Sequence, residues 1–234
     1  MSPTGADRPT DARAQLRTLA EAAGPALVPD LPTVEHPRAA SILVLFGVLD
    51  AIAADRDAAD PAVSRDLDVL LLARAATLRS HAGQVAFPGG RADPGEDDPV
   101  ATALREAREE TGLDPAGVDV LGTLPPVPLA FSRHLVTPVL GWWRRPSRVG
   151  VVDEAESAAV FRVPVAELLD PARRGVTVIR LDGREFSGPG FVVARPEAEY
   201  VVWGFTGMLL DALFDRLGWS EPWDRSREIA LALP

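Results

Sequence analysis

Runs of seven or eight mostly apolar residues recur along the chain, and polar or proline-containing segments separate them. The first two runs cover residues 41–48 and 67–74. Continuous apolar character over this length predicts neighbouring strands buried in a sheet. Further strands are expected at 118–129, with a break at Pro125 and Pro126, and at 135–143 and 156–163. A hairpin is expected from 176–181 and 191–194.

Apolar residues spaced three and four positions apart predict helices in other segments. One covers residues 11–23 and can be capped by Asp11, a short one covers 164–169, and a closing one covers 201–217. Together with the strands, these helices predict the α/β class. The most regular apolar stripe comprises Val100, Ala103, Leu104, Ala107 and Thr111, and Gly112 follows it as a potential left-handed cap.

The N-terminal part differs in composition from the rest. Residues 25–38 contain four prolines and are expected to be extended. We therefore divide the chain into an N-terminal helix with a proline-rich linker, residues 1–38, and one compact domain, residues 39–234. A length of 234 residues with 47% hydrophobic content is sufficient for one such domain with additions.

Charge and residue usage exclude several classes of function. With 24 basic and 34 acidic residues the net charge is −10, which disfavours binding to nucleic acid or to an anionic membrane. The absence of cysteine excludes disulfides and thiolate metal sites. Because no apolar run approaches the length of a membrane helix and no signal core is present, we expect a cytoplasmic protein.

Three carboxylates gather on the helix that carries the regular stripe. Glu106, Glu109 and Glu110 lie on adjacent turns, where like charges repel and destabilise a helix. Divalent cations such as Mg²⁺ and Mn²⁺ prefer oxygen ligands and are often shared between carboxylates and substrate phosphates. The glycine turn Gly89-Gly90 shortly upstream favours this interpretation over a merely solvated acidic face.

These residues resemble the Nudix box, G-x5-E-x7-R-E-U-x-E-E-x-G-U, in which U is aliphatic. Gly90 and Glu96 match its first half, and residues 105–113 match its second half. Eight residues rather than seven separate Glu96 from Arg105. Either Asp97 takes the place of Glu96, or the loop accommodates one additional residue.

The resemblance implies a fold, a cofactor and a set of roles. The fold would be the Nudix α/β/α sandwich, with a mixed sheet between helices. Glu106, Glu109 and Glu110 would bind Mg²⁺ or Mn²⁺, and Arg105 would orient a neighbouring carboxylate. The general base would be Glu106, Glu109 or a carboxylate from another loop, for which Glu156 is the candidate.

A second motif lies directly upstream, in residues 70–90, LLLARAATLRSHAGQVAFPGG. It resembles L-L-T-x-R-[SA]-x3-R-x3-G-x3-F-P-G-G, the motif of the coenzyme A pyrophosphatase branch of the Nudix family, with Leu72 in place of threonine. His81 lies inside the motif and could contact a phosphate or face solvent. The residues that the resemblance assigns to substrate binding are Arg74, Arg79, Gly83, Phe87, Gly89 and Gly90.

The activity implied is metal-dependent hydrolysis of the pyrophosphate bond of coenzyme A or its derivatives, giving 3′,5′-ADP and 4′-phosphopantetheine. Two alternatives stay open. The first is hydrolysis of another nucleoside diphosphate compound, such as ADP-ribose, NADH or a dNTP. The second is a non-catalytic ligand-binding Nudix domain, which the retained carboxylates disfavour. The expected partner is a small-molecule substrate. A homodimer is considered because Trp142 and Trp143 are adjacent on a strand and are not both expected to face inward, which leaves one of them for a dimer contact.

Overall fold

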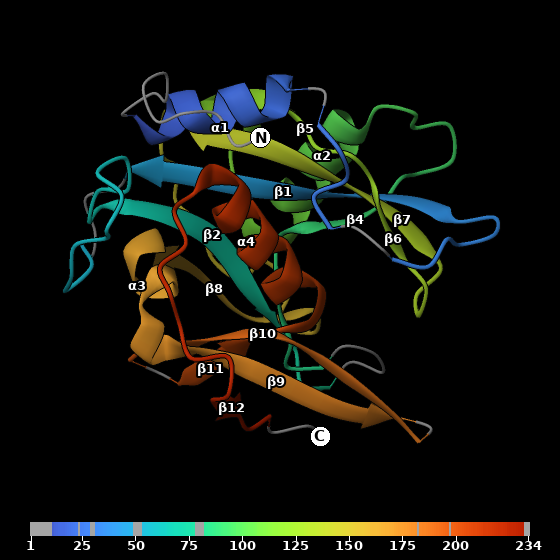
Figure 1. Cartoon of the computed structure of the whole chain (residues 1–234). Helices are drawn as coiled ribbons and strands as arrows, with labels where there is room; N and C mark the ends of the chain where they lie inside the picture. Colours follow the sequence, from blue (N-terminus) through green and yellow to red (C-terminus); the bar gives the residue numbers. More distant parts are fainter. Residues whose placement is uncertain are drawn as a thin grey trace.

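The computed structural model describes residues 11–22, 24–28, 31–48, 53–77, 82–181, 183–196 and 198–231. Its centre is a mixed sheet, which has eight strands within these ranges (Figure 1). Strand β1 (Arg38–Val48) pairs antiparallel with β2 (Leu67–Arg74) and β4 (Gly89–Arg91), and parallel with β7 (His134–Trp143). The remaining strands are β3 (Val85–Ala86) and β8 (Ser157–Pro164) beside β2, and β5 (Val118–Thr123) and β6 (Val127–Leu129) beside β7.

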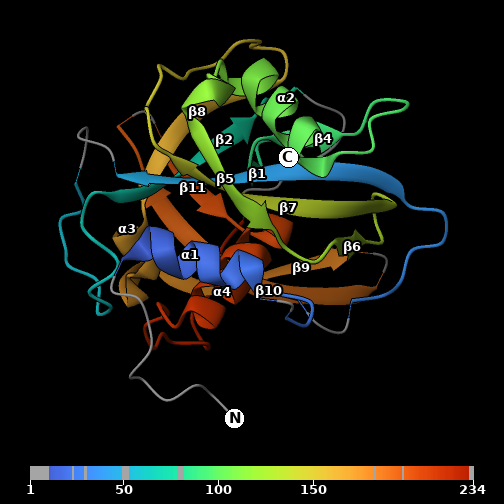
Figure 2. The same ribbon diagram turned by 90° about the horizontal axis from the view of Figure 1, so that it is seen from above.

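Helices cover both faces of this sheet, as the sequence predicts (Figure 2). Helix α2 (Pro99–Thr111) lies on one face, where Ala103 and Ala107 belong to a small buried cluster. The opposite face packs in a larger cluster with three helices. These are α1 (Ala12–Glu21), α3 (Val165–Leu169) and α4 (Gly204–Leu217), and short 3-10 turns occupy Pro115–Gly117 and Pro171–Arg173.

A second sheet adjoins α3 and α4 below the first one in Figure 1. Its order is β11 (Glu199–Val202), β10 (Arg184–Ala194), β9 (Arg174–Leu181) and β12 (Glu228–Ile229). The predicted hairpin is confirmed as β9 and β10, although both strands are longer than expected. The helix predicted from residue 201 is wrong at its start, because Val201 and Val202 pair with β10 and α4 begins only at Gly204.

The N-terminal helix packs on the larger cluster. Leu16 is fully buried, and the indole nitrogen of Trp219 donates a hydrogen bond of 2.6 Å to Gln15. Asp11 caps the helix by accepting a bond from the backbone N–H of Arg13. The division of the chain at residue 39 stays a prediction. No helix in the described ranges is long and apolar enough to cross a membrane, and the cytoplasmic location also stays a prediction.

The adjacent tryptophans of β7 both pack against protein. Trp143 is buried in the small cluster beneath α2, whereas Trp142 is partly buried against the larger cluster. The expectation that only one of them can face inward is therefore wrong, because helices cover both faces of the sheet. These two side chains consequently give no support to a homodimer.

A buried ion pair joins two strands of the main sheet and carries a testable pH dependence. The Nε atom of Arg162 in β8 donates to Asp68 in β2 at 2.7 Å, and Asp68 is 4% exposed. Burial outweighs the hydrogen bond from Arg162 and raises the pKa of Asp68 from 3.8 to about 6. Between these values the folded chain holds a proton that the unfolded chain has lost.

We therefore expect Asp68 to make the free energy of unfolding fall as pH rises from about 4 to about 6. At about 1.4 kcal/mol per pH unit, this contribution amounts to roughly 3 kcal/mol. Urea unfolding of the wild type and of Asp68→Asn across this range isolates the contribution of Asp68. The two pH profiles should differ in slope, and parallel profiles would contradict the assignment.

Candidate functional site

Helix α2 is fixed at both ends by residues of the box. Asp98 caps its start by accepting a bond of 2.9 Å from the backbone N–H of Val100, and Pro99 occupies the first turn. Gly112 ends it in the left-handed conformation, with φ of 72°, which glycine adopts without steric cost. The small stripe packs on the sheet as predicted, and beside it Glu106 and Glu110 are partly buried whereas Glu109 is exposed.

The glycine pair forms strand β4 rather than an isolated turn. Gly89 pairs with Ile42 and Gly90 with Ser41 in the central strand β1. A Cβ atom at Gly89 would lie 2.3 Å from the backbone oxygen of Ser41. A Cβ atom at Gly90 would lie 2.4 Å from the carboxyl carbon of Glu106. Glycine is required at position 89, because the backbone of β1 approaches too closely for any side chain, whereas a side chain at position 90 would displace the carboxylate of Glu106.

The two innermost carboxylates contact this glycine strand. Glu106 packs against Gly90, and Glu110 accepts a hydrogen bond of 2.9 Å from the backbone N–H of Gly89. Burial raises the pKa of both carboxyl groups, that of Glu110 to about 7. The negative charge of Glu106 contributes to the raised pKa of Glu110, so the two carboxylates interact with each other.

Arg105 forms ion pairs with three carboxylates of the box. It bonds to Glu96 at 2.9 Å, to Glu106 at 3.0 Å and to Glu109 at 3.1 Å. It also donates a bond of 2.9 Å to the backbone carbonyl of Arg91. These contacts offset the repulsion expected among like charges on one helix. They agree with the orienting role expected for Arg105, which stays a prediction.

The structure distinguishes between the two interpretations of the longer box loop, in which either Glu96 or Asp97 lies beside Arg105. The Arg105 side chain donates two bonds to the carboxylate of Glu96, whereas Asp97 is exposed. The hydrogen bond from Arg105 is the main cause that lowers the pKa of Glu96 to about 2. The loop therefore accommodates its additional residue while Glu96 keeps its place beside the arginine.

The carboxylate oxygens of the box are suitable ligands for a divalent cation, although they do not converge on a single point in this structure. In the described part of the chain, no three aspartate, glutamate or histidine side chains are close enough to hold a metal ion. Glu109 is 59% exposed, and its ion pair within the described residues is the one with Arg105 at 3.1 Å. Glu106 and Glu110 offer hard oxygen donors whose charge is costly to bury, and a bound cation would reduce that cost.

Two residues from outside the box lie within electrostatic reach of Glu110. Arg74, at the end of β2, lowers the pKa of Glu110, and Glu156, just before β8, raises it. The Nε atom of Arg74 is buried and has no hydrogen-bond partner among the residues that the structure describes. Glu156 is exposed, and its backbone carbonyl accepts a bond of 2.9 Å from Ala75. The fold thus brings both predicted residues to the candidate site, although neither touches a box carboxylate.

The other predicted substrate-binding residues differ in their surroundings. Gly83 adopts a positive φ of 68° with open space around it. Phe87 is only 3% exposed and belongs to the larger core cluster, so its position indicates packing rather than contact with a ligand. Arg79 and His81 lie outside the described residues.

Two contacts at the site were not predicted. The backbone carbonyl of Arg91 accepts from Arg105, and the carboxylate of Asp93 lies 3.7 Å from the same guanidinium. A main-chain acceptor leaves no signal in the sequence. The three acids Asp93, Asp97 and Asp98 look equivalent in sequence, and only the shape of the loop distinguishes them.

Comparison with known proteins identifies the family of this chain. A model of the NUDIX domain matches residues 55–180, which is more than half of the chain. The chain is 42% identical over 150 residues to the uncharacterised Nudix hydrolase NudL of Cronobacter sakazakii, covering 64% of this chain and 75% of that protein. The NudL protein of Photorhabdus laumondii is 39% identical over 145 residues, with 62% and 74% covered.

The chain therefore belongs to the Nudix family, and its class is that of the Nudix hydrolases. Enzymes of this class hydrolyse nucleoside diphosphate derivatives and generally use divalent metal ions such as Mg²⁺. Similar solved structures include the Nudix hydrolase RenU of M. smegmatis, with 24% identity, a TM-score of 0.41 and 55% and 71% of the two chains covered. Another is the NUDIX domain of Shewanella oneidensis NrtR complexed with ADP ribose, with 21% identity, a TM-score of 0.41 and 58% and 77% covered.

Proposed function

We propose that this enzyme hydrolyses the pyrophosphate bond of coenzyme A and its derivatives, with Mg²⁺ or Mn²⁺ as cofactor. The observation that carries the proposal is that Arg74, at the end of β2, is close enough to Glu110 for its charge to lower the pKa of that carboxyl group. Arg74 is the first arginine of the coenzyme A motif, so this proximity connects that motif with the carboxylates of the box. A guanidinium binds phosphate oxygens through its planar set of N–H donors, and the described part of the chain offers the Nε of Arg74 no hydrogen-bond partner.

In this proposal the residues of the candidate site would have three roles: metal binding, orientation of the carboxylates and phosphate binding. Glu106, Glu109 and Glu110 would hold the metal, which supplies charge neutralisation and an activated water when bound. Arg105 keeps Glu106 and Glu109 oriented toward each other by the bonds described above. Arg74 and Arg79 would bind the phosphates, and the glycine strand would let the substrate approach the backbone.

The reaction consumes one water and breaks one bridging P–O bond. The products are 3′,5′-ADP and 4′-phosphopantetheine, and the attacking water loses a proton. Glu106, Glu109 and Glu156 are the candidates for accepting that proton. The exposure of Glu156 favours exchange of the proton with solvent, whereas Glu106 is partly buried and bonded to Arg105.

A panel of substrates tests the proposal. Coenzyme A, acetyl-coenzyme A, ADP-ribose, NADH and a dNTP would each be incubated with Mg²⁺ and with Mn²⁺, and the products identified by mass spectrometry. We expect the highest kcat/KM for the two coenzyme A compounds. Turnover of ADP-ribose or NADH that is far faster than that of coenzyme A would overturn the substrate assignment while keeping the class.

Removal of the proposed phosphate ligand should weaken substrate binding. We expect Arg74→Gln to raise KM for coenzyme A about tenfold or more, because a hydrogen bond to a charged group is lost. Arg17→Gln is the matched control, since Arg17 is exposed on α1. Steady-state kinetics would measure both, and equal values of KM for Arg74→Gln and the wild type would contradict the assignment.

A further inference from the structure

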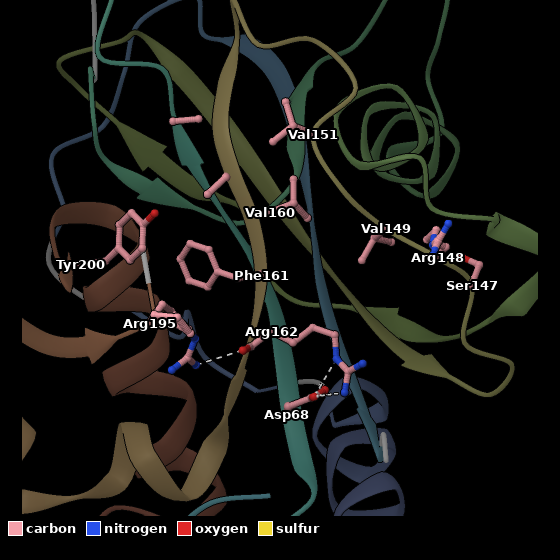
Figure 3. A pocket seen from close by; sticks show the side chains of 13 residues that line it. Asp68, Ser147, Arg148, Val149, Val151, Val160, Phe161, Arg162, Arg195 and Tyr200 are labelled. Atoms are coloured by element: carbon pink, nitrogen blue, oxygen red, sulfur yellow. Dashed lines mark hydrogen bonds and ion pairs between the residues drawn. The ribbon is translucent and has the colours of Figure 1, made fainter. Parts of the chain in front are cut away.

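A groove of about 700 Å³ follows strand β8 (Figure 3). One wall is the segment 147–151, which includes Val149 and Val151, and the other wall contains Arg195 and Tyr200. Cavities of this volume are typical of small-molecule sites. No residue of the box lines the groove, so its function is not explained by the carboxylate site alone.

The floor of the groove is the free edge of β8. Within the described residues β8 pairs only with β2, and its other edge faces the groove. The backbone carbonyl of Arg162 accepts a bond of 2.9 Å from Arg195, outside the sheet, so it is directed to this edge. Because orientation alternates along an antiparallel strand, the backbone N–H and carbonyl of Val160 also face the edge.

A bulge frees one more residue of β8. Ala73 pairs with Ala159 and Arg74 pairs with Ser157, so Ala158 has no partner in β2. Ala158 is also exposed and lines the groove. Ala158 and Val160 therefore offer main-chain hydrogen-bonding groups to a ligand lying along the edge. Bulges are frequent next to active sites, where they re-aim the chain.

This bulge lies beside the candidate site. Ser157 is paired with Arg74, and Glu156 precedes it directly. Both Arg74 and Glu156 act electrostatically on Glu110. If the diphosphate of a ligand lies at the box carboxylates, the end of the groove at Ser157, called the near end below, is therefore next to it.

The chemistry of the groove beside β8 favours a neutral ligand, because the remaining lining arginine, Arg148, lies away from the strand on the wall formed by residues 147–151 (Figure 3). Its near end is lined by small and apolar side chains, including Ala158, Val151 and Val160. Farther along, Arg162 is paired with Asp68, and Arg195 is paired with Glu167 at 3.2 Å. These arginines are already neutralised, so they do not favour a second phosphate. Phe161 and Tyr200, stacked at 4.8 Å, add an apolar surface with a hydroxyl group at its rim.

We infer that this groove binds the pantetheine arm of the substrate, extended along the free edge of β8. The inference rests on the proposed function. The arm is uncharged and has two amides, which match the free main-chain groups of Ala158 and Val160. Its chain of atoms is comparable to about four extended residues, roughly 14 Å. The edge from Ser157 to Arg162 spans about 17 Å, so the thiol or acyl end lies near Phe161 and Tyr200.

A bulky residue in the groove tests this inference. Ala158→Trp would be compared with Val120→Trp, which places the same side chain on β5, on the other side of β1 and β7, where Val120 is 38% exposed. Each would be assayed with coenzyme A and with a synthetic analogue. The analogue keeps the 3′-phosphoadenosine diphosphate and carries a methyl group in place of the arm.

We expect Ala158→Trp to lower kcat/KM for coenzyme A at least about tenfold and to leave the analogue unaffected. Val120→Trp should change neither value. If the wild type hydrolyses coenzyme A and Ala158→Trp affects both substrates equally or neither, the groove assignment is overturned and the proposed function stands. A change of oligomeric state in Ala158→Trp with equal losses would instead assign the edge to a second copy. If the wild type does not hydrolyse coenzyme A, the proposed function fails first and the assignment fails with it.

Discussion

Replacement of Glu110 by glutamine is expected to lower kcat for coenzyme A roughly 10³-fold. A metal ion bound at a catalytic site stabilises the charge of the transition state by several kcal/mol, and about 1.4 kcal/mol corresponds to a factor of ten in rate. Glutamine retains an oxygen that can accept the bond from Gly89, which now measures 2.9 Å. It also removes the cost of burying a carboxylate, so the variant should fold at least as well as the wild type.

The comparison needs three measurements. Steady-state kinetics give kcat, thermal unfolding gives the stability, and Mn²⁺ titration followed by electron paramagnetic resonance gives metal affinity. Glu154→Gln serves as the control, because Glu154 is an exposed carboxylate in the turn before β8. We expect the control to match the wild type in all three. Unchanged kcat in Glu110→Gln would remove Glu110 from the metal site.

The glycine strand should separate stability from activity. In Gly89→Ala, the new Cβ would lie 2.3 Å from the backbone oxygen of Ser41 and 2.6 Å from the Cα of Ile42. Neither atom can move without distorting the central strand β1. We expect the free energy of unfolding to fall by about 3 kcal/mol, at the upper end of the cost of overpacking.

In Gly90→Ala, the nearest atoms instead belong to the side chain of Glu106, which can rotate away. We expect the stability to stay within about 1 kcal/mol of the wild type, because the neighbour is flexible. We expect kcat to fall about a hundredfold, since the carboxylate is displaced. Urea unfolding and kinetics on both variants test the pair. A Gly90→Ala variant with normal kcat would show that the position of Glu106 is not critical.

Several features of the fold could be predicted from local pattern. Residues 41–48 and 67–74 are mostly apolar runs. Strand β2 covers 67–74 as predicted, and β1 ends at residue 48 as predicted but begins three residues earlier, at Arg38. The two prolines at 125 and 126 separate β5 from β6 as expected, because proline cannot donate to a strand ladder. Helix α2 was predictable from its small stripe and its cap Gly112.

Other features depended on distant partners. Val201 and Val202 continue the apolar pattern of α4, yet they form β11 because β10 is available for pairing. Phe87 belongs to the substrate motif, but the closing of the larger cluster buries it. The groove along β8 combines Asp68, residues 147–151, β8 and the segment from Arg195 to Tyr200, and no spacing in the sequence connects them.

By itself, the sequence determined the family, the residue types of the candidate site and their order along one helix. Those properties are local, since helical periodicity and a glycine pair need only neighbouring residues. The tertiary structure decided that Glu96 rather than Asp97 meets Arg105 and that Arg74 and Glu156 lie near Glu110. It also decided that one edge of β8 has no strand partner among the described residues. These outcomes depend on strand pairing and loop shape, which are set by contacts between residues far apart in the chain.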